Sequence, residues 1–178
     1  MKQLRKDDGY ILVYVLVVFL VLSFAAVAIC TGAVQNLRAQ QASIARTQAL
    51  YEAEGKIESY VANLMTKEVA SSSLCFSEDD AKRAAAAAFW EAAKTPGVEL
   101  SATVENEGST QDLNILTVQA ISGGRSATVV AKLSVTLELH ANQDTSDPVK
   151  YKGSAKVKTD GIQYSSYDIS YSTGGDAE

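Results

Sequence analysis

The chain is 178 residues long and carries a formal net charge of −5. Apart from one long apolar segment, the chain suits a single compact domain, which excludes a large multidomain enzyme. The mild acidity gives no general attraction to polyanions, so nucleic acid is not an expected partner.

Residue types that bind metals or carry out redox and acid–base chemistry are scarce. Cys30 and Cys75 are the two cysteines, and Cys30 lies inside the apolar segment, so neither a disulfide framework nor a cysteine zinc site is expected. The single histidine, His140, has no cysteine near it in sequence, which favours a surface residue at a strand end. Since no catalytic pair, phosphate loop or dinucleotide glycine pattern occurs in the sequence, we expect no enzyme activity and no cofactor.

The apolar segment, residues 10–34, follows a short charged start. No charged residue lies between Asp8 and Arg38. As a helix, the segment would be about 37 Å long, enough to cross ~30 Å of hydrocarbon. Three cations precede it: Lys2, Arg5 and Lys6. Positive residues stay on the cytoplasmic side, so we expect a single-pass inner-membrane (cytoplasmic-membrane) protein with its C-terminus outside.

Three interpretations of this start are open. A cleaved signal peptide would be cut after Ala28, but its apolar stretch would be about twice the usual ~7–15 residues. A lipoprotein signal would use Cys30, but Ile29 stands where a small residue is needed. In the third interpretation, residues 1–9 are a charged leader that ends at Gly9, and the retained helix begins at Tyr10.

The third arrangement resembles the leader of type IV prepilins. The resemblance implies cleavage after Gly9 by prepilin peptidase, N-methylation of Tyr10, and retention of the apolar helix as filament core. Most major pilins carry a glutamate at the fifth mature residue, where this chain has Tyr14. Loss of that glutamate is typical of minor or tip subunits, so the resemblance favours a minor role.

Beyond Val34 the pattern becomes amphipathic, which predicts one helix continuing to about Thr66, with residues 35–70 as a helical stalk. Gly32 and Gly55 are its expected soft points, each costing ~1 kcal/mol relative to alanine. The stretch 48–58, which contains Glu54 and Gly55, resembles the end of the N-terminal region of PilX-type minor pilins and pseudopilins. This resemblance covers roughly residues 1–65. The apolar positions are Leu37, Ile44, Leu50, Ala53, Ile57, Val61 and Leu64.

Residues 71–178 predict an exterior α+β domain. Ser77 is an expected N-cap for a helix over 78–94, which Pro96 and Gly97 end. Its expected packing face is Ala81, Ala85, Phe89 and Ala92, with Trp90 packing at the domain edge. Alternating patterns predict strands at 98–105, 113–121, 129–139, 151–157 and 162–171, the last two joined by a turn around 159–161. The expected fold class is therefore α+β: a long N-terminal membrane-spanning helix packed on a small antiparallel sheet. The resemblance to pilins implies the same pilin-like architecture.

Two surface features are candidate binding sites. The oxygen-bearing side chains of Asn142, Asp144 and Asp147 have spacings similar to calcium loops, but the segment lacks the loop glycine and final glutamate, which favours a polar turn. Four lysines are expected on one strand face, where they offer a contact for DNA or an acidic polymer. Protection of an edge strand against aggregation is the favoured interpretation. The lysines are Lys150, Lys152, Lys156 and Lys158.

The sequence thus predicts a structural minor subunit of a type IV pilus-like or pseudopilus filament. Its expected partners are other pilin subunits, the pilus assembly machinery, prepilin peptidase and the membrane, and its final location is the pilus or cell surface. Two alternatives remain open: a bitopic membrane protein whose exterior domain binds a ligand or envelope partner without polymerising, and a secreted binding domain released after Ala28. Whether such a machine serves adhesion, motility, secretion or DNA uptake is not decided by sequence.

Overall fold

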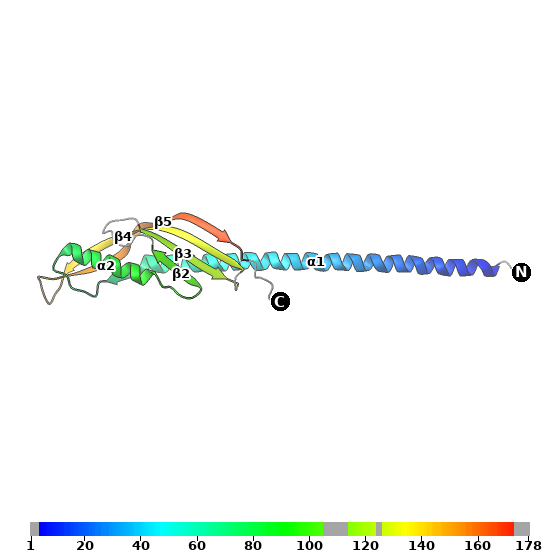
Figure 1. Cartoon of the computed structure of the whole chain (residues 1–178), viewed down its shortest axis with the longest axis horizontal. Coiled ribbons are helices and arrows are strands. Elements are labelled where there is room, and N and C mark those ends of the chain that lie inside the picture. The colour runs from blue at the N-terminus through cyan, green and yellow to red at the C-terminus, as the bar shows by residue number, and fades with distance from the viewer. Residues whose placement is uncertain (1–3, 105–113, 124–125, 173–178) are drawn as a thin grey trace. The chain divides into compact units, whose positions relative to one another are not determined.

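The computed structural model describes the backbone of residues 4–104, 114–123 and 126–172, and the side chains of these residues except 4–9 and 114. The chain divides into two compact units, Met1–Ile44 and Ala45–Glu178. Figure 1 labels the helices and strands of both units.

The helix α1 covers Leu4–Thr66 and so begins before the expected Tyr10. Its N-terminal part, up to Ile44, belongs to the first unit. From Tyr10 onward α1 is the one helix among the described residues that is long and apolar enough to cross a membrane. Its apolar window has a mean hydropathy of 3.0, and none of it is buried. The helix continues through Gly32, because glycine can adopt helical backbone angles.

The second unit contains the end of α1, a further helix and a five-stranded antiparallel sheet in the order β1-β5-β4-β3-β2. The expected meander is confirmed as β2 to β5, and Figure 1 shows these strands running side by side in a curved sheet. The helix and strands are β1 (Glu68–Ala70), α2 (Glu78–Ala93), β2 (Leu100–Val104), β3 (Asn114–Ser122), β4 (Ala127–Gln143) and β5 (Tyr151–Ser170).

The core of this unit lies on one face of the sheet, where α1 and α2 pack. The odd-numbered residues of β4 from Val129 to Leu139 pack in or against the core as predicted, because alternate side chains of a strand lie on opposite faces. Phe89 and Trp90 of α2 meet edge to face with ring centroids 5.5 Å apart. The largest fully buried side chains include Ile57, Leu64, Phe89, Leu116, Val118, Val129, Leu133 and Val135.

The predicted turn at 159–161 is wrong, because β5 continues from Tyr151 to Ser170. Val157 pairs with Leu137 and Ile162 pairs with Val135, so Lys158–Gly161 form a bulge opposite Thr136. Both predicted strands are halves of β5, since each pairs with a different part of the long strand β4. A β-bulge accommodates the turn-forming residues without ending the strand.

The fifth strand, β1, was not predicted and lies within the expected helical stalk 35–70. It pairs with Ser154, Ala155 and Lys156 of β5. The lysine-bearing strand β5 is therefore not a free edge along its whole length, which corrects that part of the prediction. A three-residue strand is too short to produce a recognisable alternating pattern.

The packing face of α2 also differs from the prediction. Ala92 is exposed, whereas Ala93 is buried, and Trp90 lies in the core rather than at the domain edge. The helix is rotated slightly about its axis relative to the predicted face, so both aromatic side chains are buried. Ser77 has the extended backbone of an N-cap, although its side chain makes no capping hydrogen bond.

Candidate functional site

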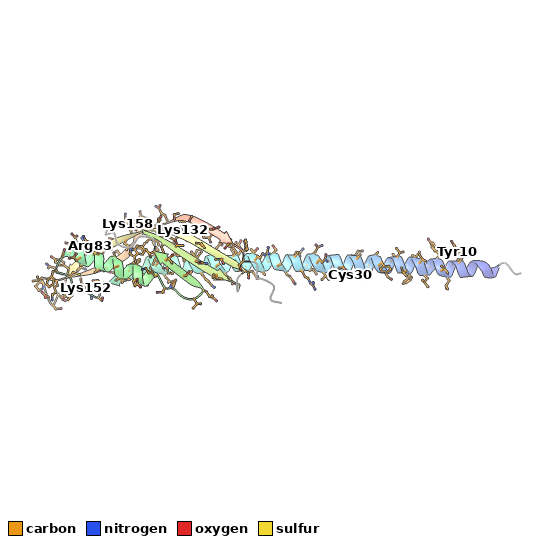
Figure 2. The ribbon with its side chains drawn as sticks, in the orientation of Figure 1. Tyr10, Cys30, Arg83, Lys132, Lys152 and Lys158 are labelled. Carbon is orange, nitrogen blue, oxygen red and sulfur yellow. The ribbon has the colours of Figure 1, made fainter. Side chains whose placement is uncertain are left out.

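The predicted processing residues lie at the start of α1. Residues 1–3 are outside the described residues, and the side chains of 4–9 are not described, so cleavage after Gly9 stays a prediction. Tyr10 and Tyr14 are both exposed on the helix. Figure 2 labels Tyr10 and Cys30, whose side chains point away from the α1 axis.

The apolar segment of α1 exposes an uninterrupted apolar surface. Soluble proteins rarely leave so large an apolar surface without a partner, and this surface is suited to contact with lipid or with another apolar surface. Two polar side chains in this segment form hydrogen bonds within the helix. The hydroxyls of Ser23 and Thr31 each donate to the backbone carbonyl four residues earlier, at 2.8 Å. Such internal hydrogen bonds remove the need for water in an apolar environment.

Glu54, which was predicted to belong to the assembly helix, lines a cleft of about 320 Å³ between α1 and β5. The other lining residues are Ile57 and Glu58 from α1, and Tyr164 and Tyr167 from β5. The two tyrosine rings meet edge to face, with centroids 6.4 Å apart and planes at 74°. Two carboxylates one helical turn apart thus share an open cleft with two aromatic rings. We call this the acidic–aromatic cleft.

The carboxylates influence the phenols of the acidic–aromatic cleft. Partial burial raises the pKa of Tyr167 to about 12, and a hydrogen bond to Glu54 contributes to the shift. Partial burial, followed by the charge of Glu58, also raises the pKa of Tyr164. Both phenols therefore keep their protons to a higher pH than an ordinary tyrosine. Carboxylates beside aromatic rings suit an organic cation such as a guanidinium or an ammonium group.

Gly55, the other predicted residue of this segment, lines a separate groove of about 550 Å³ together with Lys56, Tyr60 and Leu100. Lys56 spans to the sheet, where its Nζ lies 2.5 Å from Glu99 Oε2 and 3.0 Å from the Ile121 carbonyl. These two interactions of Lys56 hold α1 against the sheet.

Two of the calcium candidates, Asp144 and Asp147, lie in a polar turn after β4, whereas Asn142 lies within β4. Asp144 donates its backbone N–H to the Lys150 carbonyl at 2.8 Å, which closes the turn. The Asp147 carboxylate accepts the Val149 N–H at 3.2 Å and pairs with Lys150 Nζ at 3.0 Å. Asn142 is paired within the sheet. Across the described part of the chain, no group of three His, Cys, Asp or Glu side chains is placed to hold a metal ion.

The four lysines of the β5 region do not form one uncompensated patch. Lys152 alone among them has no ion pair with a described residue, and Figure 2 labels it together with Lys158. The ion pairs are Lys150–Asp147 at 3.0 Å, Lys156–Glu138 at 3.3 Å and Lys158–Asp160 at 4.0 Å. This internal compensation weakens the case for a polyanion contact.

His140 is exposed near the end of β4, as expected, with Nε2 3.2 Å from Glu138 Oε1. Cys30 is exposed and Cys75 is half-buried, and both are free thiols. The backbone of Cys75 pairs with that of Tyr151, so this cysteine extends the edge pairing begun by β1.

Sequence reasoning missed Tyr164 and Tyr167. The bulges of β5 determine on which face of the sheet each tyrosine lies, and the alternating sequence pattern carries no information about where bulges occur.

The comparisons with known proteins add no relative: no protein-family model, curated protein or solved structure matches this chain.

Proposed function

We propose that this chain is a minor structural subunit of a type IV pilus-like or pseudopilus filament. The observation that carries the proposal is the fully exposed apolar helix from Tyr10, joined in one chain to an α+β unit that has its own core. A helix of this kind is stored in a membrane and then packs against the helices of neighbouring subunits. The transfer exchanges lipid contacts for protein contacts without exposing the apolar surface to water.

The proposed order of events begins at the leader. Prepilin peptidase cuts after Gly9, and Tyr10 becomes the methylated first residue of a single-pass membrane protein whose C-terminal unit lies outside the cytoplasmic membrane. Assembly machinery then lifts the subunit into a filament. The hydrogen-bonded hydroxyls of Ser23 and Thr31 support this route, since neither leaves an unsatisfied donor in lipid or in a filament core.

Tyr14 supports a minor role. In a membrane a carboxylate at this depth costs free energy and is retained only for a task, which by resemblance is pairing with a neighbour's terminal amine. A chain without the carboxylate suits the start of a filament or a short stack of copies at one end.

The rival is a bitopic protein whose exterior domain binds a ligand or an envelope partner and never polymerises. The intact mass of the protein purified from its native host separates processing of the prepilin type from the alternatives. We expect loss of residues 1–9, with the mass of one added methyl group. A full-length chain contradicts prepilin processing, and a chain starting at Ile29 indicates ordinary signal cleavage.

A further inference from the structure

The charges of α1 are distributed unevenly. Between Asp8 and Glu52 the sequence contains two charged residues, Arg38 and Arg46, and both are cations. Both are exposed, and neither makes an ion pair with a described residue. Arg46 belongs to the same compact unit as the acidic–aromatic cleft. One short stretch of α1 thus carries an uncompensated cation followed by uncompensated carboxylates.

The acidic–aromatic cleft lacks a cation of its own. In the described part of the chain, no lysine or arginine lies within ion-pair distance of Glu54 or Glu58. Arg46 of the same chain does not reach them, because it precedes Glu54 by eight residues and Glu58 by twelve. At ~1.5 Å per residue these separations are about 12 and 18 Å along a continuous helix.

We propose that the acidic–aromatic cleft binds Arg46 of a second copy of this chain. The charges are complementary: a guanidinium pairs with Glu58 and lies against the rings of Tyr164 and Tyr167, a combination that favours arginine over lysine. The carboxylates of the open cleft have no cationic partner among the described residues, and the exposed guanidinium of Arg46 has no anionic one, so the two charges can pair between copies.

This contact requires a stagger between the two copies. Parallel copies held at one membrane depth place their Arg46 side chains level with one another, about 12–18 Å below the clefts. The pair therefore forms only after one copy has moved outward relative to its neighbour, as filament assembly requires. The inference thus rests on the proposed function, and it gives a short stack of copies a register that does not need a carboxylate at Tyr14.

Cross-linking of the full-length precursor, expressed in its native host, tests the contact. Arg46→Cys and Glu58→Cys are combined in a Cys30→Ser, Cys75→Ser background and treated with a bis-maleimide shorter than the separation of the two positions within one chain. Any product joining positions 46 and 58 is then intermolecular. We expect this product in sheared fibres, at a level several-fold above that of the matched pair Arg46→Cys with Ser59→Cys. Ser59 is the adjacent exposed residue and lines the other groove instead.

The outcomes separate the two proposals. Fibres that contain the chain but yield no 46–58 product, or equal yields at 58 and 59, overturn the inference and leave the proposed function standing. Efficient 46–46 products from the single Arg46→Cys variant show unstaggered packing and also overturn it. Absence of the chain from fibres contradicts the proposed function itself.

A charge exchange provides an independent measurement of incorporation into fibres. Arg46→Glu and Glu58→Arg should each reduce incorporation several-fold, and the double exchange should restore most of it. Failure of the double exchange to exceed either single variant contradicts a direct pair, because loss of folding in one variant is not reversed by its partner.

Discussion

Tyr60 of α1 donates its hydroxyl to the backbone carbonyl of Ala93, the last residue of α2, with an O···O distance of 2.5 Å. Nearby, Lys67 Nζ lies 3.0 Å from the Ala92 carbonyl. The last carbonyls of a helix have no partners within the helix, and cations favour its negative end. Two side chains from the α1 end region therefore cap α2 and fix it against the core.

Tyr60→Phe should lower the free energy of unfolding of the second unit by about 1 kcal/mol, because the Ala93 carbonyl loses its partner in a half-buried place. Denaturant unfolding of the full chain in detergent, followed through Trp90 fluorescence, measures the loss. Tyr51→Phe is the matched control, since Tyr51 lies exposed on the same helix. Equal effects of the two substitutions would show that the hydroxyl contact contributes nothing.

Alkaline pH should also weaken the second unit. Burial raises the pKa of Tyr60 from 10.0 to about 12. The folded state thus holds this proton more tightly than the unfolded state, so stability should be constant below about pH 10 and fall between about pH 10 and 12. Tyr60→Phe should flatten this fall and remove one late step from the tyrosinate absorbance titration. Unchanged slopes in the variant would contradict the assignment to Tyr60.

Two glycines should respond oppositely to alanine. At Gly153 a Cβ would lie 1.9 Å from the Ala81 carbonyl oxygen and 3.0 Å from Ala85 Cβ, so α2 and β5 must separate. We expect Gly153→Ala to destabilise the unit by about 3 kcal/mol. At Gly55 a Cβ meets nothing within 4 Å, so Gly55→Ala should stabilise α1 by about 0.5–1 kcal/mol. Melting temperatures of the two variants check both signs, and a loss at Gly55 would indicate a functional bend there.

The sequence was sufficient for local patterns and insufficient for contacts between distant segments. The apolar length of α1 and the inward residues of β4, such as Val129 and Leu133, follow directly from periodicity. The Asp160-Gly161 pair has turn chemistry, but pairing of both flanking segments with β4 converts the turn into a bulge. The acidic–aromatic cleft needs Tyr167 beside Glu54, a juxtaposition that no local pattern contains.

The absence of a glutamate at Tyr14 predicts that the chain is a minor rather than a major subunit. If the chain starts or caps a filament, sheared fibres should contain far fewer copies of it than of a pilin that carries the fifth-residue glutamate. Its deletion should reduce fibre number more than fibre length. Quantitative mass spectrometry of the fibres and counting by electron microscopy measure both quantities. If the chain is the main fibre component, the minor-subunit assignment is wrong.

The substitution Tyr14→Glu adds the missing carboxylate and so tests the same position directly. A carboxylate costs about 2.5–3.5 kcal/mol at mid-membrane depth and less near the interface, and Tyr14 lies only four residues into the segment that begins at Tyr10. We therefore expect normal membrane insertion and a higher copy number in fibres, because the chain gains the carboxylate that pairs with a neighbour's terminal amine. Val21→Glu is the matched control, since it places the same charge deeper in the segment and should impair insertion. Normal insertion of both variants with unchanged copy number would show that position 14 does not govern assembly, and the bitopic alternative would then gain support.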